Sequence, residues 1–187
     1  MSTPRVLPLS IAEAIEAAAL VGIDEAKAGF SIYRVLLREP QYAKRVNDMA
    51  EMLMTDSQLD PRLRELIIMR IGWTKKGVYE WTQHWWIAGQ LGVEERDLLA
   101  VRDWESHDHW SPVDRAVLRA TDETLERGTI SQPTWEECAE HFPTDRERID
   151  LVATIGNWKM MSEVLTTLAV PLEEGFAPWP PDGVVPA

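Results

Sequence analysis

Hydrophobic positions along the chain recur mostly at intervals of three and four residues, the spacing that places side chains on one face of an α-helix. Helix start and stop signals separate these segments, and the strict alternation that is typical of β-strands does not recur. The pattern therefore predicts an all-α protein. Capping boxes mark three of the expected helix starts: Ser10-x-x-Glu13, Thr134-x-x-Glu137 and Thr144-x-x-Glu147.

Proline and glycine divide the helical segments, because proline fits the first turn of a helix but disfavours helix in the residue before it. Asp60-Pro61 and Ser111-Pro112 are each typical of a helix start, and Gly92 and Gly128 of a helix end. Residues 103–110 are polar and aromatic and are predicted to form a loop. The expected helices are 10–22, 31–39, 40–54, 60–73, 78–91, 93–102, 111–128, one that begins at 134, and 144–169.

The expected helix 78–91 carries an acid and a base, Glu80 and His84, at positions i and i+4 of one face. From this spacing alone, the simpler interpretation is an exposed ion pair that stabilises the helix by roughly 0.2–0.5 kcal/mol. Nearby tryptophans favour apolar walls instead, against which a carboxyl holds its proton more tightly and an imidazole can accept or return one. The tryptophans are Trp73, Trp81, Trp85 and Trp86.

Four short motifs follow one another in this region: Arg64-Glu65-Leu66, Gly72-Trp73, Tyr79-Glu80-Trp81-x-x-His84 and Gly89-x-Leu91-Gly92. With them the chain resembles the carboxymuconolactone decarboxylase family, whose wider group includes the AhpD-like alkylhydroperoxidase accessory proteins. The resemblance covers about residues 30 to 174. It implies an AhpD-like helical bundle that assembles as a homo-oligomer, a trimer or a hexamer.

The resemblance also divides the chain. Residues 1–29 are expected to be an N-terminal helical arm, residues 30–174 the carboxymuconolactone decarboxylase-like domain, and residues 175–187 a Pro-rich tail that is extended or forms an arm. Inside the domain, residues 62–72 are echoed by residues 146–156, at an offset of 84 positions. Two related helical halves and chance similarity between amphipathic helices both explain this echo, and the sequence leaves the choice open.

The chain departs from the redox branch of that wider group, whose members carry Cys-x-x-Cys followed by a histidine three residues later. Gly77 and Glu80 stand at the two cysteine positions, and the only cysteine, Cys138, lies on a different expected helix. A redox dithiol needs two sulfurs that can reach each other. Thiol peroxidase or disulfide reductase chemistry by that route is therefore excluded, and Cys138 is predicted to be a small buried residue.

Three residues are the catalytic candidates that the resemblance implies. His84 is expected to act as the proton shuttle, Glu80 as its partner or as the acid, and Glu65 as the group that polarises or orients the pair. Without the resemblance, Glu65 would most simply pair with Arg62 or Arg64. The resemblance to this family implies proton transfer without a metal or a cofactor.

Substrate-binding candidates come from the same region: Tyr79, Trp81, Gln83, Arg64 and Trp73. The hydroxyl of Tyr79 could donate to a substrate oxygen or lie at the surface, and Gln83 could orient His84 or a carboxylate. Trp73 and Trp81 are expected to form part of a pocket wall, although most tryptophans are more typical of a core or a subunit interface. Arg62, Arg64 or Arg70 could bind a substrate carboxylate, and the sequence does not choose between them.

Composition narrows the possible partners. A net charge of −12 argues against binding nucleic acid or an anionic membrane surface. One cysteine, no apparent signal peptide and no apolar run of about 18 residues together predict a cytoplasmic protein. His107-Asp108-His109 contains metal-ligand types, but adjacent loop residues seldom converge on one ion, so no metal site is predicted.

The leading hypothesis is a cofactor-independent lyase or isomerase that acts on a small carboxylic acid or lactone by acid–base proton transfer. The alternative is a non-catalytic, oligomeric binding or assembly protein that keeps the scaffold without the redox cysteines.

Overall fold

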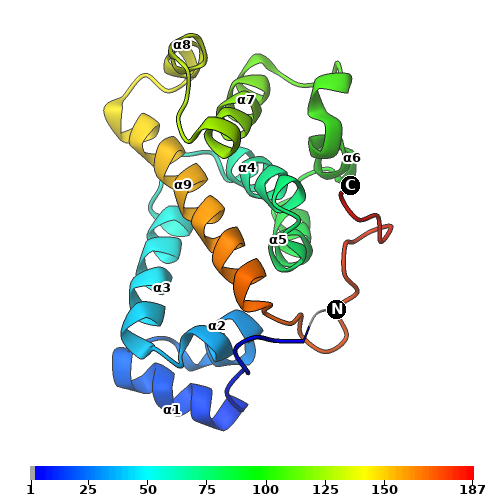
Figure 1. The fold of residues 1–187 in the computed structure, drawn as a ribbon. Helices are drawn as coiled ribbons and strands as arrows, with labels where there is room; N and C mark the ends of the chain where they lie inside the picture. Colours follow the sequence, from blue (N-terminus) through cyan, green and yellow to red (C-terminus); the bar gives the residue numbers. More distant parts are fainter. Residues whose placement is uncertain (1–2) are drawn as a thin grey trace.

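A computed structural model describes residues 3–187, and this part of the chain is helical without any strand (Figure 1). The predicted fold class is therefore confirmed. Two 3-10 helices, η1 (Glu25–Gly29) and η2 (Val101–Ser106), accompany the α-helices. These are α1 (Ile11–Val21), α2 (Ser31–Leu36), α3 (Pro40–Thr55), α4 (Pro61–Thr74), α5 (Val78–Gln90), α6 (Glu95–Ala100), α7 (Pro112–Arg127), α8 (Gln132–His141) and α9 (Asp145–Leu168).

Local signals explain most of the helix boundaries. The capping boxes at Ser10 and Thr144 begin α1 and α9 as predicted, and the carboxylate of Asp60 caps α4 immediately before its first proline. The predicted box at Thr134 is wrong, because α8 already begins at Gln132. The hydroxyl of Thr134 instead donates to Glu123 of α7, so a tertiary contact takes the place of the local cap.

Two further corrections concern connecting segments. Residues 103–106, expected in a loop, belong to the 3-10 helix η2. The tail does not project as an arm but folds back onto α5, where the backbone carbonyl of Pro180 accepts a hydrogen bond from Trp81 Nε1 at 2.8 Å. Trp179 of this tail is buried against Trp73 and Trp81.

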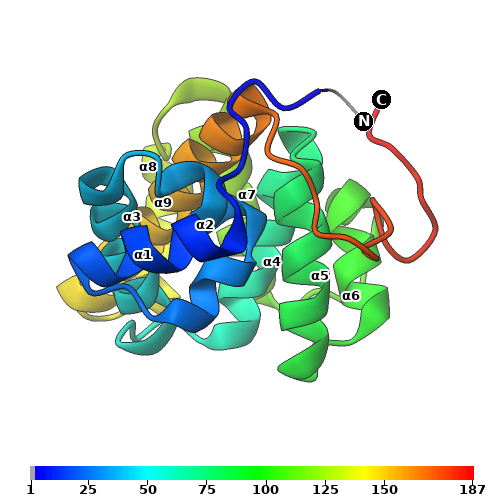
Figure 2. The ribbon, with the colours of Figure 1, turned by 90° about the horizontal axis from the view of Figure 1, so that it is seen from below.

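The buried apolar side chains form two clusters, and the long helix α9 contributes to both. The larger cluster contains side chains from α4, α5, α6, α7 and α8, and it includes Leu151, Ile155 and Trp158 of α9. The smaller joins α1, α2 and α3, and it includes Met161 and Leu165 of α9. In both ribbon views, α1 to α3 gather on one side of the molecule and α4 to α7 on the other (Figures 1 and 2). The boundary between the two clusters is where the candidate site lies.

The N-terminal segment that was expected to be an arm packs against this smaller cluster. Ala14 and Ala18 of α1 are completely buried there, while residues 1 and 2 lie outside the described part of the chain. The internal echo falls on most of α4 and on the first half of α9, and these two helices pack against each other. Helix α9 runs on without the break that separates α4 from α5, so the correspondence does not extend into the motif helix. None of the helices in residues 3–187 combines the length and the apolar character needed to cross a membrane.

Candidate active site

Helices α4, α5 and α9 bring three buried side chains together. His84 of α5 is 7% exposed, and its Nδ1 lies 2.7 Å from Oε2 of Glu65, a fully buried residue of α4. The indole N–H of Trp158, on α9, donates to His84 Nε2 at 3.1 Å. Close packing of α4 on α5 depends on Gly72, since a Cβ at this position would lie 3.1 Å from the backbone nitrogen of Trp81.

The hydrogen bonds define the protonation pattern of the neutral imidazole. An indole N–H can only donate, so His84 Nε2 is the acceptor and Nδ1 carries the proton that is donated to Glu65. The second oxygen of Glu65 accepts from Arg64 Nε at 3.1 Å, and Arg64 Nη1 donates to the backbone carbonyl of Met54 at 3.0 Å. Glu65 is thus a paired carboxylate that orients the ring of His84.

Glu80 is the second acidic group at His84. Its Oε2 lies 3.5 Å from His84 Nε2, and its side chain is buried. Burial raises the pKa of Glu80 above its ordinary value, although the charge of a protonated His84 opposes this. Burial lowers the pKa of His84, but the carboxylates of Glu65 and Glu80 more than offset this effect and raise it. Both groups therefore hold a proton to higher pH than they would in water.

Glu80 and His84 face a cavity of about 230 Å³ at the boundary of the two apolar clusters. Its walls are mostly apolar side chains from α2, α3, α5 and α9, such as Leu36, Val46 and Met161. No lysine or arginine is among the residues that line it. The cavity thus combines a small apolar chamber with a buried acid and a buried imidazole, the elements of a proton-transfer site.

Two of the predicted substrate-binding residues also line this cavity, and both donate a hydrogen bond to Glu173. The hydroxyl of Tyr79 donates to Glu173 Oε1 at 2.7 Å and accepts from the backbone N–H of Ile32 at 3.2 Å. The side-chain amide of Gln83 donates to the other oxygen of Glu173. Burial, with the neighbouring Glu173 carboxylate, raises the pKa of Tyr79. In this arrangement Glu173 positions two wall residues, because it accepts from the hydroxyl of Tyr79 and from one N–H of Gln83.

Trp73 and Trp81 do not line the cavity, so the expectation that they form its wall is corrected. Their rings lie 5.1 Å apart, in a cluster with Trp85 and Trp179. The guanidinium of Arg102 stands 4.6 Å above the ring of Trp73. This side of α5 packs against the core and the tail, where Trp81 and Trp85 are buried.

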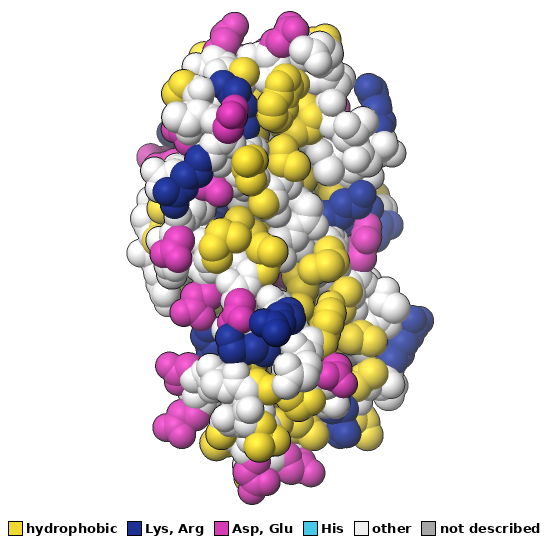
Figure 3. Space-filling view, turned by 90° about the vertical axis from the view of Figure 1, so that its left-hand side faces the viewer, with side chains coloured by type: hydrophobic (Ala, Val, Ile, Leu, Met, Phe, Trp, Pro, Cys, Tyr) yellow, Lys and Arg dark blue, Asp and Glu magenta, His cyan; other side chains and the backbone are white. Residues whose placement is uncertain are grey.

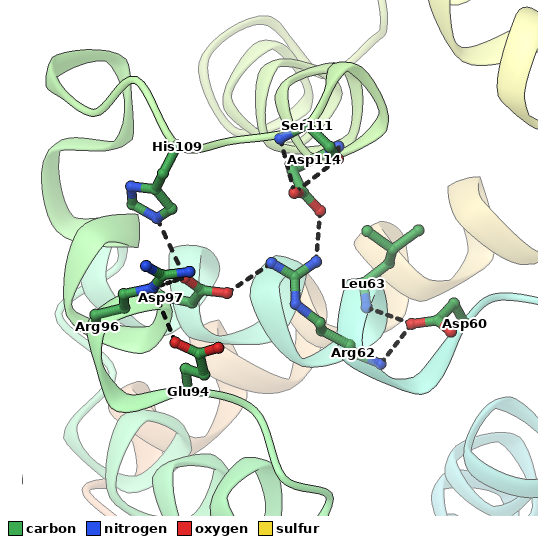
Figure 4. Close-up of polar contacts among 9 residues, drawn as sticks. All are labelled: Asp60, Arg62, Leu63, Glu94, Arg96, Asp97, His109, Ser111 and Asp114. Atoms are coloured by element: carbon green, nitrogen blue, oxygen red, sulfur yellow. Dashed lines mark hydrogen bonds and ion pairs between the residues drawn. The ribbon is translucent and has the colours of Figure 1, made fainter.

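The three candidate arginines are also held elsewhere. Arg62 bridges Asp97 and Asp114 at 2.7 and 2.6 Å, and so links α4 to α6 and α7 (Figure 4). Arg70 makes a two-pronged contact with Asp122, and Arg64 is buried against Glu65. None of them lines the cavity, so the expected positive charge for a substrate carboxylate is not supplied by these residues.

Sequence reasoning missed the residues that α9 and the following segment contribute. Trp158 and Asn157 reach the cavity from α9, and Glu173 lies beyond the end of that helix. Trp158 is 74 positions from His84, and no local motif marks it. The sequence places Trp158 on a long helix but does not indicate which other helix its side chain contacts.

The remaining candidate groups lie away from this cavity. Cys138 is completely buried on α8, and burial raises its thiol pKa to about 11, so it is poorly suited to redox chemistry. His107 and His109 pair with different acids, Asp103 and Asp97, each at 3.1 Å. Within residues 3–187 no group of three or more His, Cys, Asp or Glu side chains is placed to hold a metal ion.

Comparison with known proteins places this site in a family context. The model of the carboxymuconolactone decarboxylase family matches residues 40–123, which include Glu65, Glu80 and His84. No curated protein sequence matches the chain.

Solved structures share the fold at low sequence identity. The AhpD core of a peroxidase-related protein from Ralstonia eutropha JMP134 matches over 99% of both chains, with a TM-score of 0.75 and 16% identity. A peroxidase-related protein from Silicibacter sp. TM1040 matches over 94% of this chain and 92% of its own, with a TM-score of 0.69 and 17% identity. A variant of the debrominase Bmp8, in complex with 2,3,4-tribromopyrrole, matches over 93% of this chain and 94% of its own, with a TM-score of 0.75 and 15% identity.

Proposed function

We propose that the chain is an acid–base enzyme, on the strength of the match of residues 40–123 to the carboxymuconolactone decarboxylase family model and of its AhpD-like fold. Its reaction moves a proton to or from a carbon atom of a small substrate, in a lyase or isomerase step on a lactone or a related acid. The observation that carries this proposal is the contact between Glu80 and His84 at the wall of an apolar cavity, with Glu65 behind the imidazole.

The proposed division of work follows from the pKa directions. Loss of a carboxyl group, or of a proton next to a carbonyl, leaves a carbanion or dienolate that must be protonated at carbon. Glu80, whose pKa is raised by burial, is the general acid that supplies this proton. Glu80 is then reprotonated by the His84 imidazolium through Nε2. That imidazolium forms when neutral His84 takes up a proton from solvent at Nε2, and the Glu65 carboxylate stabilises it.

The test is turnover and solvent-deuterium incorporation at carbon, measured in D₂O on carboxymuconolactone and a panel of related lactones and β-keto acids. The wild type is expected to turn over at least one compound or exchange its acidic C–H. His84→Ala and Glu80→Gln are expected to lower that rate by about 10²–10⁴-fold, the usual contribution of a positioned acid or base.

An exposed acid and histidine with the same spacing provide the matched control. Asp103 and His107 are also four positions apart and in contact, but they lie at the surface and outside the cavity. Asp103→Asn and His107→Ala should leave the rate unchanged. Near-wild-type rates in His84→Ala would contradict the assignment. Binding of panel members without turnover or exchange would favour the alternative, a ligand-binding protein.

We also propose that the chain forms a homo-oligomer. Hydrophobic side chains gather in a band along the face shown in Figure 3. Several exposed apolar residues of α3 and α9 are of the kind that subunit contacts bury: Met49, Met52, Ile149 and Val152. Light scattering should give a mass above the 21.3 kDa of one chain, and a strict monomer would contradict this proposal.

A further inference from the structure

One polar side chain of the cavity is left unpaired. Asn157 lines the cavity and is only 8% exposed, yet its buried Oδ1 accepts no hydrogen bond within residues 3–187. A buried acceptor without a partner costs folding free energy, which a ligand that donates to it would recover. Asn157 lines the same cavity as Glu80 and His84, so a ligand bound at this amide would lie in the same chamber as the proposed proton-transfer groups.

The charges around the cavity restrict which ligands can enter. Its lining contains no lysine or arginine, and it contains the carboxyl group of Glu80. The only lining residue that can be cationic is His84, and its imidazole is already held by Glu65 at 2.7 Å and Trp158 at 3.1 Å. An anion entering this chamber would lose its hydration without gaining a free counter-charge.

The volume of the cavity also limits the size of the ligand. The cavity volume of about 230 Å³ lies below the range of roughly 300–1,000 Å³ that is usual for drug-sized ligands. Its walls are predominantly apolar, so most of the ligand surface must be apolar as well.

We propose that this cavity binds its substrate as an uncharged, mainly apolar molecule the size of one small ring, whose hydroxyl or N–H group donates to Oδ1 of Asn157. This inference rests on the proposed function, since it assigns a substrate class to the same cavity. It narrows the panel to uncharged lactones and to acids that enter in their protonated, uncharged form, so the anionic form of carboxymuconolactone is not the expected substrate.

The experiment is calorimetric binding of three probes of similar size near pH 7: benzyl alcohol, ethylbenzene and benzoate. Benzyl alcohol is uncharged with one donor, ethylbenzene has no donor, and benzoate is an anion. Benzyl alcohol is expected to bind the wild type most tightly, with benzoate weaker by about tenfold or more because the anion stays unpaired.

Three variants test the role of the amide. Asn157→Leu should weaken benzyl alcohol by about fivefold, the net effect of one neutral hydrogen bond, while ethylbenzene changes by less than about twofold. Asn157→Asp keeps an acceptor of the same size and should retain benzyl alcohol while weakening benzoate further. Thr154→Val is the matched control, because Thr154 also carries an unpaired buried oxygen on α9 but does not line the cavity. It should leave all three affinities unchanged.

Four results would overturn the inference: benzoate binding as tightly as benzyl alcohol, equal losses of benzyl alcohol and ethylbenzene in Asn157→Leu, loss of benzyl alcohol in Asn157→Asp, or no binding of benzyl alcohol by the wild type. The probes carry no scissile carboxyl or activated C–H that the reaction would need. Calorimetry therefore measures their binding without any catalytic step. A negative binding result would contradict this inference, whereas a negative turnover assay would contradict the proposed function.

Discussion

The indole N–H of Trp158 donates to Nε2 of His84, at 3.1 Å, across the contact between α9 and α5. This hydrogen bond favours the neutral imidazole, because a proton on Nε2 would face the indole N–H. The Glu65 carboxylate, 2.7 Å from Nδ1, favours the charged imidazolium instead. His84 thus lies between one contact that promotes loss of its proton and one that promotes its retention, which is the balance that the proposed proton transfer requires.

Trp158→Phe should raise the pKa of His84, because the neutral form loses its hydrogen bond while the Glu65 contact remains. One neutral hydrogen bond corresponds to a shift of about one pKa unit or less. An NMR titration of the His84 ring measures it. Trp104→Phe is the control, since Trp104 is also buried but donates to Asp122. A lowered pKa in Trp158→Phe would show that the indole does not act on the neutral ring.

The free energy of unfolding should fall as the pH rises from about 5 to about 8. Glu80 and His84 both have raised pKa values in the folded state, so the folded chain binds protons more tightly than the unfolded chain. This stabilisation is complete below the unfolded-state pKa values and is lost as the pH passes through the folded ones. The loss is at most about 1.4 kcal/mol per pH unit for each group.

Urea unfolding across this pH range measures that slope, and Glu80→Gln should reduce it. Carboxyl groups with lowered pKa values, such as Asp114 and Asp182, change stability only at more acidic pH and do not interfere. Stability that rises between about pH 5 and 8 in the wild type would contradict the pKa directions of the site.

Trp179→Ala should lower the free energy of unfolding by about 3–5 kcal/mol, the usual cost of removing a buried large aromatic side chain. Trp179 is 7% exposed within the tryptophan cluster that supports α5. Phe176→Ala is the control in the same tail, since Phe176 is only half-buried against the exposed Trp86 and should cost less. Equal effects in guanidinium unfolding would mean that the tail is not anchored through Trp179.

Gly77→Ala should be destabilising by about 1–3 kcal/mol, the range for an overpacked site. A Cβ at Gly77 would lie 2.5 Å from Oγ of Ser162, which itself makes no hydrogen bond within residues 3–187. Ser162→Ala should therefore restore most of the loss in the double variant. Gly89→Ala is the control on α5, because nothing lies within 4 Å of the new Cβ, and it should be neutral or stabilising. Additive losses in the double variant would exclude the clash with Ser162.

The thiol of Cys138 should resist alkylation in the folded protein and react only after denaturation. It is completely buried, and burial raises its pKa to about 11, so almost no thiolate is present near neutral pH. Mass spectrometry after iodoacetamide treatment, with and without urea, measures this. Rapid labelling of the native chain would contradict the buried position on α8.

Local sequence signals determined the helices and the contents of the motif helix. Capping residues such as Ser10 and Thr144 interact with residues within four positions, so their role can be predicted from the sequence alone. The spacing of Glu80 and His84 likewise required them to share a face of α5. The cap expected at Thr134 failed because Glu123, on another helix, binds the same hydroxyl.

Only the tertiary structure decided which face meets which neighbour. Helical periodicity places Glu80 and Trp81 on different faces but does not say which face borders the cavity, so Trp81 was assigned to a wall that it does not form. Trp158, Asn157 and Glu173 are far from His84 in sequence, and packing of α9 on α5 brings them to the site. The arginine pairings depend on the same long-range packing, because an ion pair forms wherever folding brings the opposite charge. The candidate acid and base were therefore visible in the sequence of one helix, whereas the shape and charge of the cavity, and its unpaired acceptor, arose from contacts between helices.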